Sequence, residues 1–219
     1  MRVVLTRRAG ANDRLAQRLR EEGFDVAEAP LIRVEPLPGP PLRVEGYDWL
    51  VVTSRAGVAE LFRRLAGPLP RVAAIGPGTA EALRERGVEP ALVARDSTQE
   101  GLARELPSPA GRVLFAGAEG ARDVLVRELA ADFLPLYRTV PLRPAAFPAG
   151  DVVVVASASA ARALAEAAPG RACVSIGPVT SRAARERGLR VAAEATTPDV
   201  EGLVRAVKLA ASRAASSPS

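Results

Sequence analysis

Short apolar runs alternate with amphipathic stretches along almost the whole chain. The runs VVLT, DWLVVT, RVAAIG, RVLFAG, DVVVVA and ACVSIG are apolar at nearly every position. The stretches between them place apolar residues three or four positions apart, as with Leu15 and Leu19, and several end at a glycine such as Gly23 or Gly87. Uniformly apolar strands that alternate with helices are typical of parallel sheets covered by helices on both faces. The pattern predicts an α/β fold, with helices near residues 10–22, 55–66, 77–86, 98–106 and 120–131.

The same pattern occurs twice. IGPGTAEALRERG at residues 75–87 returns as IGPVTSRAARERG at residues 176–188, with nine of thirteen positions identical. DWLVVTS also aligns with DVVVVAS, and PLIRVEP with PLYRTVP. A period of about 100 residues is the size of a domain and far exceeds that of short structural repeats. We therefore expect two similar domains with a ligand-binding cleft between them, joined through the proline-rich segments at 35–47 and 139–150.

The composition excludes several kinds of active site. The chain has no histidine, which removes Ser–His–Asp and Cys–His catalysis and the commonest metal ligand. Cys173, the only cysteine, lies in the apolar run RACVSI, where a buried and inert thiol is the expected state. A single cysteine also leaves no partner for a disulfide. We therefore expect neither a metal ion nor another cofactor.

The charge distribution and the N-terminal sequence indicate which kinds of partner to expect. The formal net charge is +5, and Lys208 is the only lysine among 30 basic residues. This abundance of arginine reflects either genome composition or a ligand rich in carboxylates or phosphates, which the guanidinium fork binds well. The arginines are scattered among acidic residues, so we expect no nucleic-acid partner. The start MRVVLTR is typical of a strand, and no apolar run approaches ~18 residues, so we expect a cytoplasmic protein without a membrane partner.

Candidate chemistry lies where each predicted strand meets the next helix, because ligands of open α/β sheets bind there. These junctions carry hydroxyls and glycines but no general base, metal ligand or strong nucleophile. A helix N-cap or a tight turn would explain each of them alone. Their recurrence in both halves favours a large, two-sided anionic ligand, although packing could also preserve the repeat. The junctions are Thr6-Arg7-Arg8, Thr53-Ser54-Arg55, Gly76-Pro77-Gly78-Thr79, Gly117-Ala118-Glu119-Gly120, Ser157-Ala158-Ser159 and Gly177-Pro178-Val179-Thr180.

These motifs, in this order, resemble the uroporphyrinogen-III synthase family. The resemblance rests on LTRRAG, DWLVVTSRAGV, AAIGPGTAEALRERG, STQEGLARELP, LYRTVP, VVVASASAARAL and SIGPVTSRAARERG, and covers nearly the whole chain. It implies two flavodoxin-like α/β domains with a two-stranded β-ladder as hinge, formed by PLIRVEP and PLYRTVP. The implied domains are residues 1–34 plus 143–212 and residues 35–142, with a disordered tail at 213–219. The turn ASASA departs from the bulkier or proline-containing version expected there.

The resemblance also implies a reaction. Its substrate would be hydroxymethylbilane, a linear tetrapyrrole with eight carboxylates, which closes to uroporphyrinogen III with loss of water and inversion of the last ring through a spiro intermediate. Such a reactive substrate needs positioning and charge stabilisation more than a strong base. The upstream hydroxymethylbilane synthase is a possible partner, and we expect a monomer.

Tyr137 is the implied catalytic residue, facing the cleft as a proton or hydrogen-bond donor to the departing hydroxyl. The alternative is a strand tyrosine with a packed ring and its hydroxyl in water. Arginines at the junctions would meet substrate carboxylates, or lie in exposed ion pairs. The implied substrate-binding residues are Thr79, Ser54, Thr180, Ser157, Ser159, Arg7, Gly76, Gly177, Gly117 and Arg138.

Three other functions remain open at this point. Two α/β lobes on a hinge also form non-catalytic, ligand-clamping receptors, which usually work outside the cytoplasm. A nucleotide-dependent enzyme such as a glycosyltransferase also pairs two lobes, but it would normally carry a phosphate loop, and no such motif is present. A regulator that senses a tetrapyrrole is a third alternative, and the short polar tail offers no DNA-binding domain.

Overall fold

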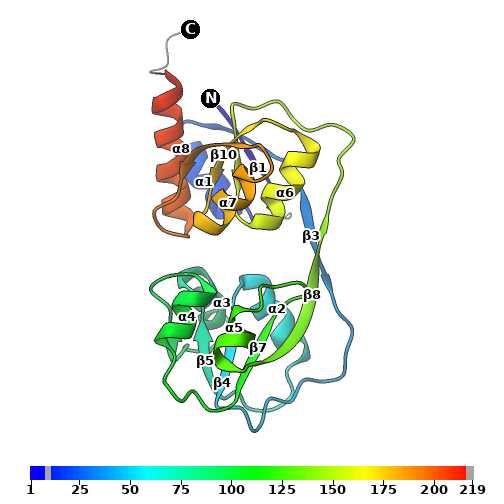
Figure 1. The fold of residues 1–219 in the computed structure, drawn as a ribbon. Coiled ribbons are helices and arrows are strands. Elements are labelled where there is room, and N and C mark those ends of the chain that lie inside the picture. Colours follow the sequence, from blue (N-terminus) through cyan, green and yellow to red (C-terminus); the bar gives the residue numbers. More distant parts are fainter. Residues whose placement is uncertain (8–10, 216–219) are drawn as a thin grey trace. The chain divides into compact units, whose positions relative to one another are not determined.

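The computed structural model describes residues 1–7 and 11–215, which form two compact units (Figure 1). Unit 1 comprises Met1–Arg33 and Val140–Ser219, and unit 2 comprises Val34–Thr139. Each unit holds a parallel sheet with helices on both faces, so the predicted two-domain α/β fold is confirmed. Within the described residues, no helix is both long enough and apolar enough to cross a membrane.

The five strands of unit 1 run parallel in the order β11-β10-β9-β1-β2. This is the flavodoxin-like doubly wound order, which reverses between β1 and β9. Helices α1 and α8 pack on one face of the sheet, and α6 and α7 pack on the other. The strands are β1 (Arg2–Leu5), β2 (Asp25–Glu28), β9 (Val152–Val155), β10 (Ala172–Ser175) and β11 (Arg190–Glu194). The helices are α1 (Asp13–Glu21), α6 (Ala158–Ala167), α7 (Pro178–Arg185) and α8 (Val200–Ala215).

Unit 2 repeats this arrangement in the order β8-β7-β4-β5-β6, with β3 beside β8. Helices α2 and α3 cover one face, and α4 and α5 cover the other. The strands are β3 (Ile32–Pro36), β4 (Trp49–Val52), β5 (Arg71–Ala74), β6 (Leu92–Val93), β7 (Val113–Ala118) and β8 (Asp132–Pro141). The helices are α2 (Arg55–Arg64), α3 (Pro77–Arg84), α4 (Gln99–Glu105) and α5 (Val124–Leu129).

The two units have the same topology but a different order along the chain. Strands β4, β5 and β6 occupy the places that β9, β10 and β11 occupy in unit 1, while β7 and β8 match β1 and β2. Unit 2 is therefore a circular permutation of unit 1, entered at its central strand. The connections between matched segments also differ in length, so the offset of the sequence repeat shifts along the chain.

The chain passes between the units within β3 and β8, which are neighbours in the sheet. The Leu37 N–H donates to the Leu136 carbonyl at 2.9 Å, and the Leu142 N–H donates to the Leu31 carbonyl at 2.8 Å. Residue numbers rise on one strand as they fall on the other, so the pair is antiparallel. The sequence repeat aligns Leu31 with Leu136 and Leu37 with Leu142. The two hydrogen bonds are therefore equivalent, each joining the same pair of repeat positions. The proline-rich segments predicted as connections lie beside these strands, and the strands themselves make the crossings.

Burial on both faces explains why the strands are apolar at every position. Successive side chains of a strand point to opposite faces. In β9, Val152 and Val154 pack against the helices on one face, while Val153 and Val155 pack against those on the other. All four are at most 2% exposed. Burying such a side chain fully stabilises the fold by about 1.5–3 kcal/mol, so these strands contribute strongly to the core on both faces.

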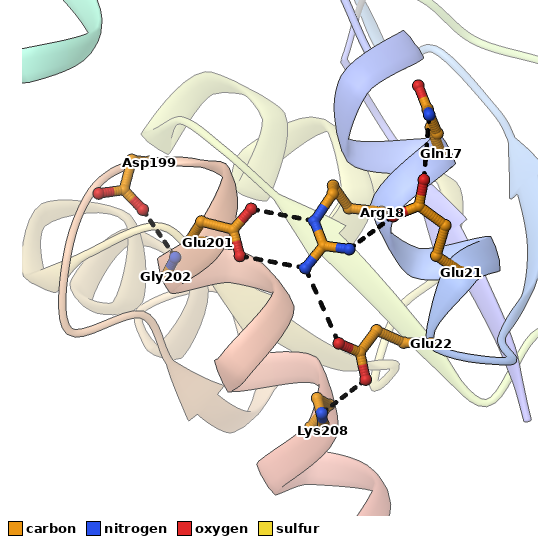
Figure 2. A network of polar contacts seen from close by, with 8 residues as sticks. All are labelled: Gln17, Arg18, Glu21, Glu22, Asp199, Glu201, Gly202 and Lys208. Carbon is orange, nitrogen blue, oxygen red and sulfur yellow. Dashed lines mark hydrogen bonds and ion pairs between the residues drawn. The ribbon is translucent and has the colours of Figure 1, made fainter.

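An ion-pair network joins α1 to α8, the first and last helices of unit 1. Figure 2 shows the Arg18 guanidinium between the carboxylates of Glu201 on α8 and Glu21 on α1, at 3.1 and 2.6 Å. In unit 2, Glu100 of α4 lies at the position of Glu201 and pairs with Arg122, which precedes α5 and is not the equivalent of Arg18. Helix α8 continues to Ala215, past residue 213, where we predicted a disordered tail. Residues 216–219 of that tail lie outside the described residues.

Candidate active site

The carboxyl edges of the two sheets present equivalent serines. Ser54 follows β4, Ser157 follows β9, and each strand lies beside the point where its sheet order reverses. Both serines cap the next helix, since Ser54 Oγ accepts from the Gly57 N–H at 2.9 Å and Ser157 Oγ accepts from the Ala160 N–H at 3.1 Å. An N-cap of this kind satisfies a helix N–H that has no partner within the helix.

A second pair of junctions carries the IGPxT repeat. Gly76 precedes α3 and Gly177 precedes α7, each followed by a proline at the first helical position. Thr79 and Thr180 lie in the first turns and are 5% and 4% exposed. The glycines differ in their surroundings, because a Cβ on Gly76 would clash with Ser97 whereas one on Gly177 would meet open space. The predicted turns therefore lie at equivalent edges, with the threonine side chains packed against the protein.

Tyr137 on β8 makes the main polar contact at the edge of unit 2. Its hydroxyl lies 2.8 Å from Ser54 Oγ, which also accepts the Gly57 N–H. The ring belongs to the hydrophobic core, and the residue is 6% exposed. Burial raises the pKa of the phenol, and the hydrogen bond from Ser54 opposes this shift. The phenol is therefore protonated at neutral pH and is able to donate.

A shift in strand register positions Tyr137. Along β7, Gly117 pairs with Pro135 of β8, whereas the next residue, Ala118, pairs with Tyr137. One extra residue of β8 is therefore accommodated here, as in a β-bulge, which redirects the following side chain. A Cβ on Gly117 would lie 2.9 Å from the ring of Phe115 on the same strand, so glycine leaves room for this ring. Gly117 thus has a packing role beside the site.

Unit 1 lacks the phenol–serine pair. The repeat aligns Tyr137 with Ile32, which has no polar side-chain atom. Ser157 Oγ instead lies 3.0 Å from Ser159 Oγ, so the two serines predicted as binding residues contact each other. The two carboxyl edges therefore share a backbone arrangement but differ in chemistry, and only the edge of unit 2 brings a phenol to its capping serine.

The two predicted arginines have partners within the protein. Arg138 is exposed and forms an ion pair of 2.8 Å with Glu35 on the neighbouring strand β3. Arg7 lies 3.5 Å from the Ala11 carbonyl. A substrate carboxylate would have to compete with Glu35 for Arg138. Within the described residues, no three acidic or cysteine side chains gather as a metal site would require.

Sequence reasoning missed several polar contacts at these edges. It named Ser54 and Tyr137 separately but did not pair them, because they are 83 residues apart in the chain. It did not single out Arg55, which contacts the first turn of α3, or Ser181, which lies in a buried hydrogen-bonded chain under α7. The only available signal was the position of both residues within the repeated motifs.

Comparisons with known proteins identify the family. A family model described as uroporphyrinogen-III synthase HemD matches residues 13–205. The chain belongs to the uroporphyrinogen-III synthase family. A rice relative named "Uroporphyrinogen-III synthase, chloroplastic" is 31% identical over 94% of this chain and 79% of its own length. A protein of Methanocaldococcus jannaschii named "Putative uroporphyrinogen-III synthase" is 29% identical over 64% of this chain and 62% of its own length.

A solved structure of the uroporphyrinogen-III synthase family shares the fold. It is a mutant uroporphyrinogen III synthase from the extremely thermophilic bacterium Thermus thermophilus, with a TM-score of 0.64 and 24% identity, covering 97% of this chain and 99% of that one. The match supports the two-domain architecture over the whole length. The family model and the rice relative confirm the family resemblance predicted from the sequence.

Proposed function

We propose that this member of the uroporphyrinogen-III synthase family closes hydroxymethylbilane to uroporphyrinogen III. The observation that carries the proposal is the Tyr137–Ser54 pair at the carboxyl edge of a parallel sheet, in a chain that has no histidine. The pair supplies a protonated phenol where α/β proteins bind their ligands. Family membership favours this enzyme over the non-catalytic binder considered from the sequence.

Proton transfer from Tyr137 begins the proposed reaction. The phenol donates its proton to the hydroxymethyl oxygen as the carbon–oxygen bond breaks, so that water leaves and a delocalised azafulvene cation forms. Ser54 is 2.8 Å from the phenolic oxygen and can donate a hydrogen bond to the phenolate that results. The developing negative charge on the phenol is thus stabilised by a donor already in place.

Ring inversion follows without further help from a strong base. The substituted carbon of the last pyrrole attacks the cation and gives a spiro intermediate. One bond of this intermediate then breaks, and the ring joins again in the inverted orientation. The proton that is lost when the last pyrrole regains aromaticity restores the phenol of Tyr137, so the net change is the loss of one water.

We propose that the remaining predicted residues hold the substrate's carboxylates. Helix N-termini present free N–H groups and a partial positive charge, which suit acetate and propionate groups. The short helix-starting turns at Ser54, Ser157, Gly76 and Gly177 have this character. Thr79, Thr180, Ser159, Gly117, Arg7 and Arg138 are the further binding residues of the proposal.

Other parts of the account stay predictions from the sequence. They are the domain boundaries at 1–34 with 143–212 and at 35–142, the cleft, the monomeric state, the cytoplasmic location and the supply of substrate by hydroxymethylbilane synthase.

An isomer assay tests the proposed function. Hydroxymethylbilane is generated without oxygen and incubated with the protein, and the oxidised products are separated by chromatography. We expect the type III isomer to dominate, against the type I isomer in a protein-free control. Type I product at the control rate, from protein shown to be folded, would overturn the proposal.

A further inference from the structure

Three polar side chains form a hydrogen-bonded chain between α7 and the sheet of unit 1, in which both serines are buried and Glu194 is half-buried. Ser175 ends β10, Ser181 lies in α7, and Glu194 ends β11. The two serine hydroxyls are 2.6 Å apart, and the hydroxyl of Ser181 also donates to the Glu194 carboxylate. Both serines are fully buried. The chain therefore ties the first half of α7 to the carboxyl ends of two neighbouring strands.

The carboxylate sets the direction of both hydrogen bonds. A serine hydroxyl has one proton to donate and can accept from others. Ser181 gives its proton to Glu194, so Ser175 must donate to Ser181. Every polar atom of the two buried hydroxyls is then used in a defined orientation, which holds the turn of α7 in one arrangement.

Unit 2 shows that packing alone does not require these groups. The repeat aligns Ser175, Ser181 and Glu194 with Ala74, Ala80 and Val93. Helix α3 packs on its sheet through these apolar residues, and Ala74 and Ala80 are fully buried. Burying a hydroxyl costs free energy unless the hydroxyl is hydrogen-bonded. Because apolar residues suffice to pack the equivalent helix, the polar chain of unit 1 has a role other than packing.

The equivalent turn of unit 2 has a tie of another kind. Arg55, which follows Ser54, donates to the Gly78 carbonyl at 3.1 Å. It also pairs, at 2.7 Å each, with Glu81 of α3 and with Glu85, which caps the end of this helix. Unit 1 has Ala158 at the position of Arg55. The IGPxT turn of each unit is thus held by polar side-chain contacts. These are exposed ion pairs in unit 2 and a chain of buried hydroxyls in unit 1.

We infer that Ser181 and Glu194 are positioning residues for the turn Gly177–Thr180. They act through the hydrogen-bonded chain on the N–H groups that this turn presents at the edge of unit 1, and they do not touch the substrate. The inference rests on the proposed function, in which this turn binds carboxylates of hydroxymethylbilane. A turn held in its binding arrangement loses less conformational freedom when the ligand arrives.

Steady-state kinetics of three variants test this role. Ser181→Ala removes the central hydroxyl, Glu194→Gln keeps an acceptor for it, and Ser212→Ala is a matched control on the exposed face of α8. We expect Ser181→Ala to raise KM for hydroxymethylbilane by about 3–10-fold with kcat within about twofold of wild type, as expected when binding alone is weakened. Glu194→Gln and Ser212→Ala should stay near wild type. An unchanged KM in Ser181→Ala would overturn the inference.

The triple variant Ser175→Ala, Ser181→Ala, Glu194→Val guards against simple unfolding. It reproduces the apolar set on which α3 packs in unit 2, so it should fold with a melting temperature close to wild type. We expect its KM to be raised like that of Ser181→Ala. A wild-type KM in this variant would show that the network serves stability alone.

Amide hydrogen exchange provides a readout that is independent of activity. In Ser181→Ala, amides 179–182 should exchange faster while those of α3 stay unchanged. In the wild type, high salt should speed exchange in the first turn of α3, whose tie is an exposed ion pair, and not in α7. If the wild type forms only type I product, the proposed function fails, and exchange still decides whether the chain holds the turn. Unchanged exchange at 179–182 in Ser181→Ala would refute the tie itself.

Discussion

Replacing Tyr137 with phenylalanine separates its chemistry from its packing. The substitution removes one oxygen and leaves the ring in the hydrophobic core, where Tyr137 is 6% exposed. It breaks the 2.8 Å contact with Ser54, whose Oγ keeps its bond from the Gly57 N–H. A neutral hydrogen bond contributes about 0.5–1.5 kcal/mol. We therefore expect the free energy of unfolding to fall by about 1 kcal/mol and the melting temperature by about 2–4 °C.

The effect on turnover should be much larger than this loss of stability. A positioned proton donor contributes about 10²-fold or more in many enzymes. Hydroxymethylbilane is reactive without a catalyst, so we place the loss of type III turnover in Tyr137→Phe at about 10–100-fold. The assay measures the initial rate of type III formation below the temperature at which the variant begins to unfold. Because burial raises the pKa of the phenol, wild-type turnover should not fall through loss of its proton until the pH exceeds about 10.

Tyr47, the only other tyrosine, supplies the matched control. Its hydroxyl donates to Asp132 at 2.8 Å. Tyr47 precedes β4, so it lies at the amino edge of the sheet, whereas Tyr137 lies at the carboxyl edge. Tyr47→Phe removes an equally short hydrogen bond from the same unit, and we expect wild-type turnover. Equal losses of turnover in both variants would trace the effect to stability. Wild-type type III turnover in Tyr137→Phe would refute the role of the phenol.

Other consequences of the structure can be checked independently. Gly76→Ala should lower the melting temperature, because its Cβ would lie 2.3 Å from Ser97 Oγ, whereas Gly177→Ala, with nothing within 4 Å, should not; equal melting temperatures would contradict this. Cys173 is fully buried, with its pKa raised to about 11 by desolvation, so a thiol reagent at pH 8 should modify it only after unfolding; rapid labelling of the native protein would argue against this. The hydrogen bond from Arg18 lowers the pKa of Glu201, so the stabilisation from this pair is present above pH ~4.3 and is lost as the pH falls through the lowered pKa. Glu201→Gln should therefore flatten the acid side of the melting-temperature profile, and an unchanged profile would exclude the pair as a source of acid sensitivity.

Local sequence patterns predict many of the helices and strands. Helices α2, α3 and α4 begin within a residue of their predicted starts, because Ser54, Gly76 and Thr98 precede them as capping or turn residues. The predicted helix near 120–131 is shorter, at Val124–Leu129. Strand β2 escaped prediction because its sequence, DVAE, is short and has charged ends. A strand or helix with a fully buried face can be recognised from its apolar pattern. The edge strand β2 has no fully buried residue, so its sequence shows no such pattern.

The candidate site was less predictable, because its contacts join distant parts of the chain. The family resemblance named Tyr137 and Ser54, but only the folded β8 and α2 place their oxygens together. Ser181 lies within a repeated motif, but nothing in the sequence shows that Glu194 lies beside it. Local capping can be read from neighbouring residues. Partners across a parallel sheet follow from the order of its strands, which the sequence does not state.

The central claim is that this protein inverts the last ring of its substrate, and carbon–carbon connectivity tests it most directly. Hydroxymethylbilane is labelled with carbon-13 at the bridge to the last ring and at the ring carbon bonded to it, so the pair shows one-bond coupling by NMR. Inversion breaks this bond, whereas direct closure keeps it. The account predicts that the coupling disappears in product made with the protein and persists in product formed without it. Intact coupling in the enzymatic product would contradict the account.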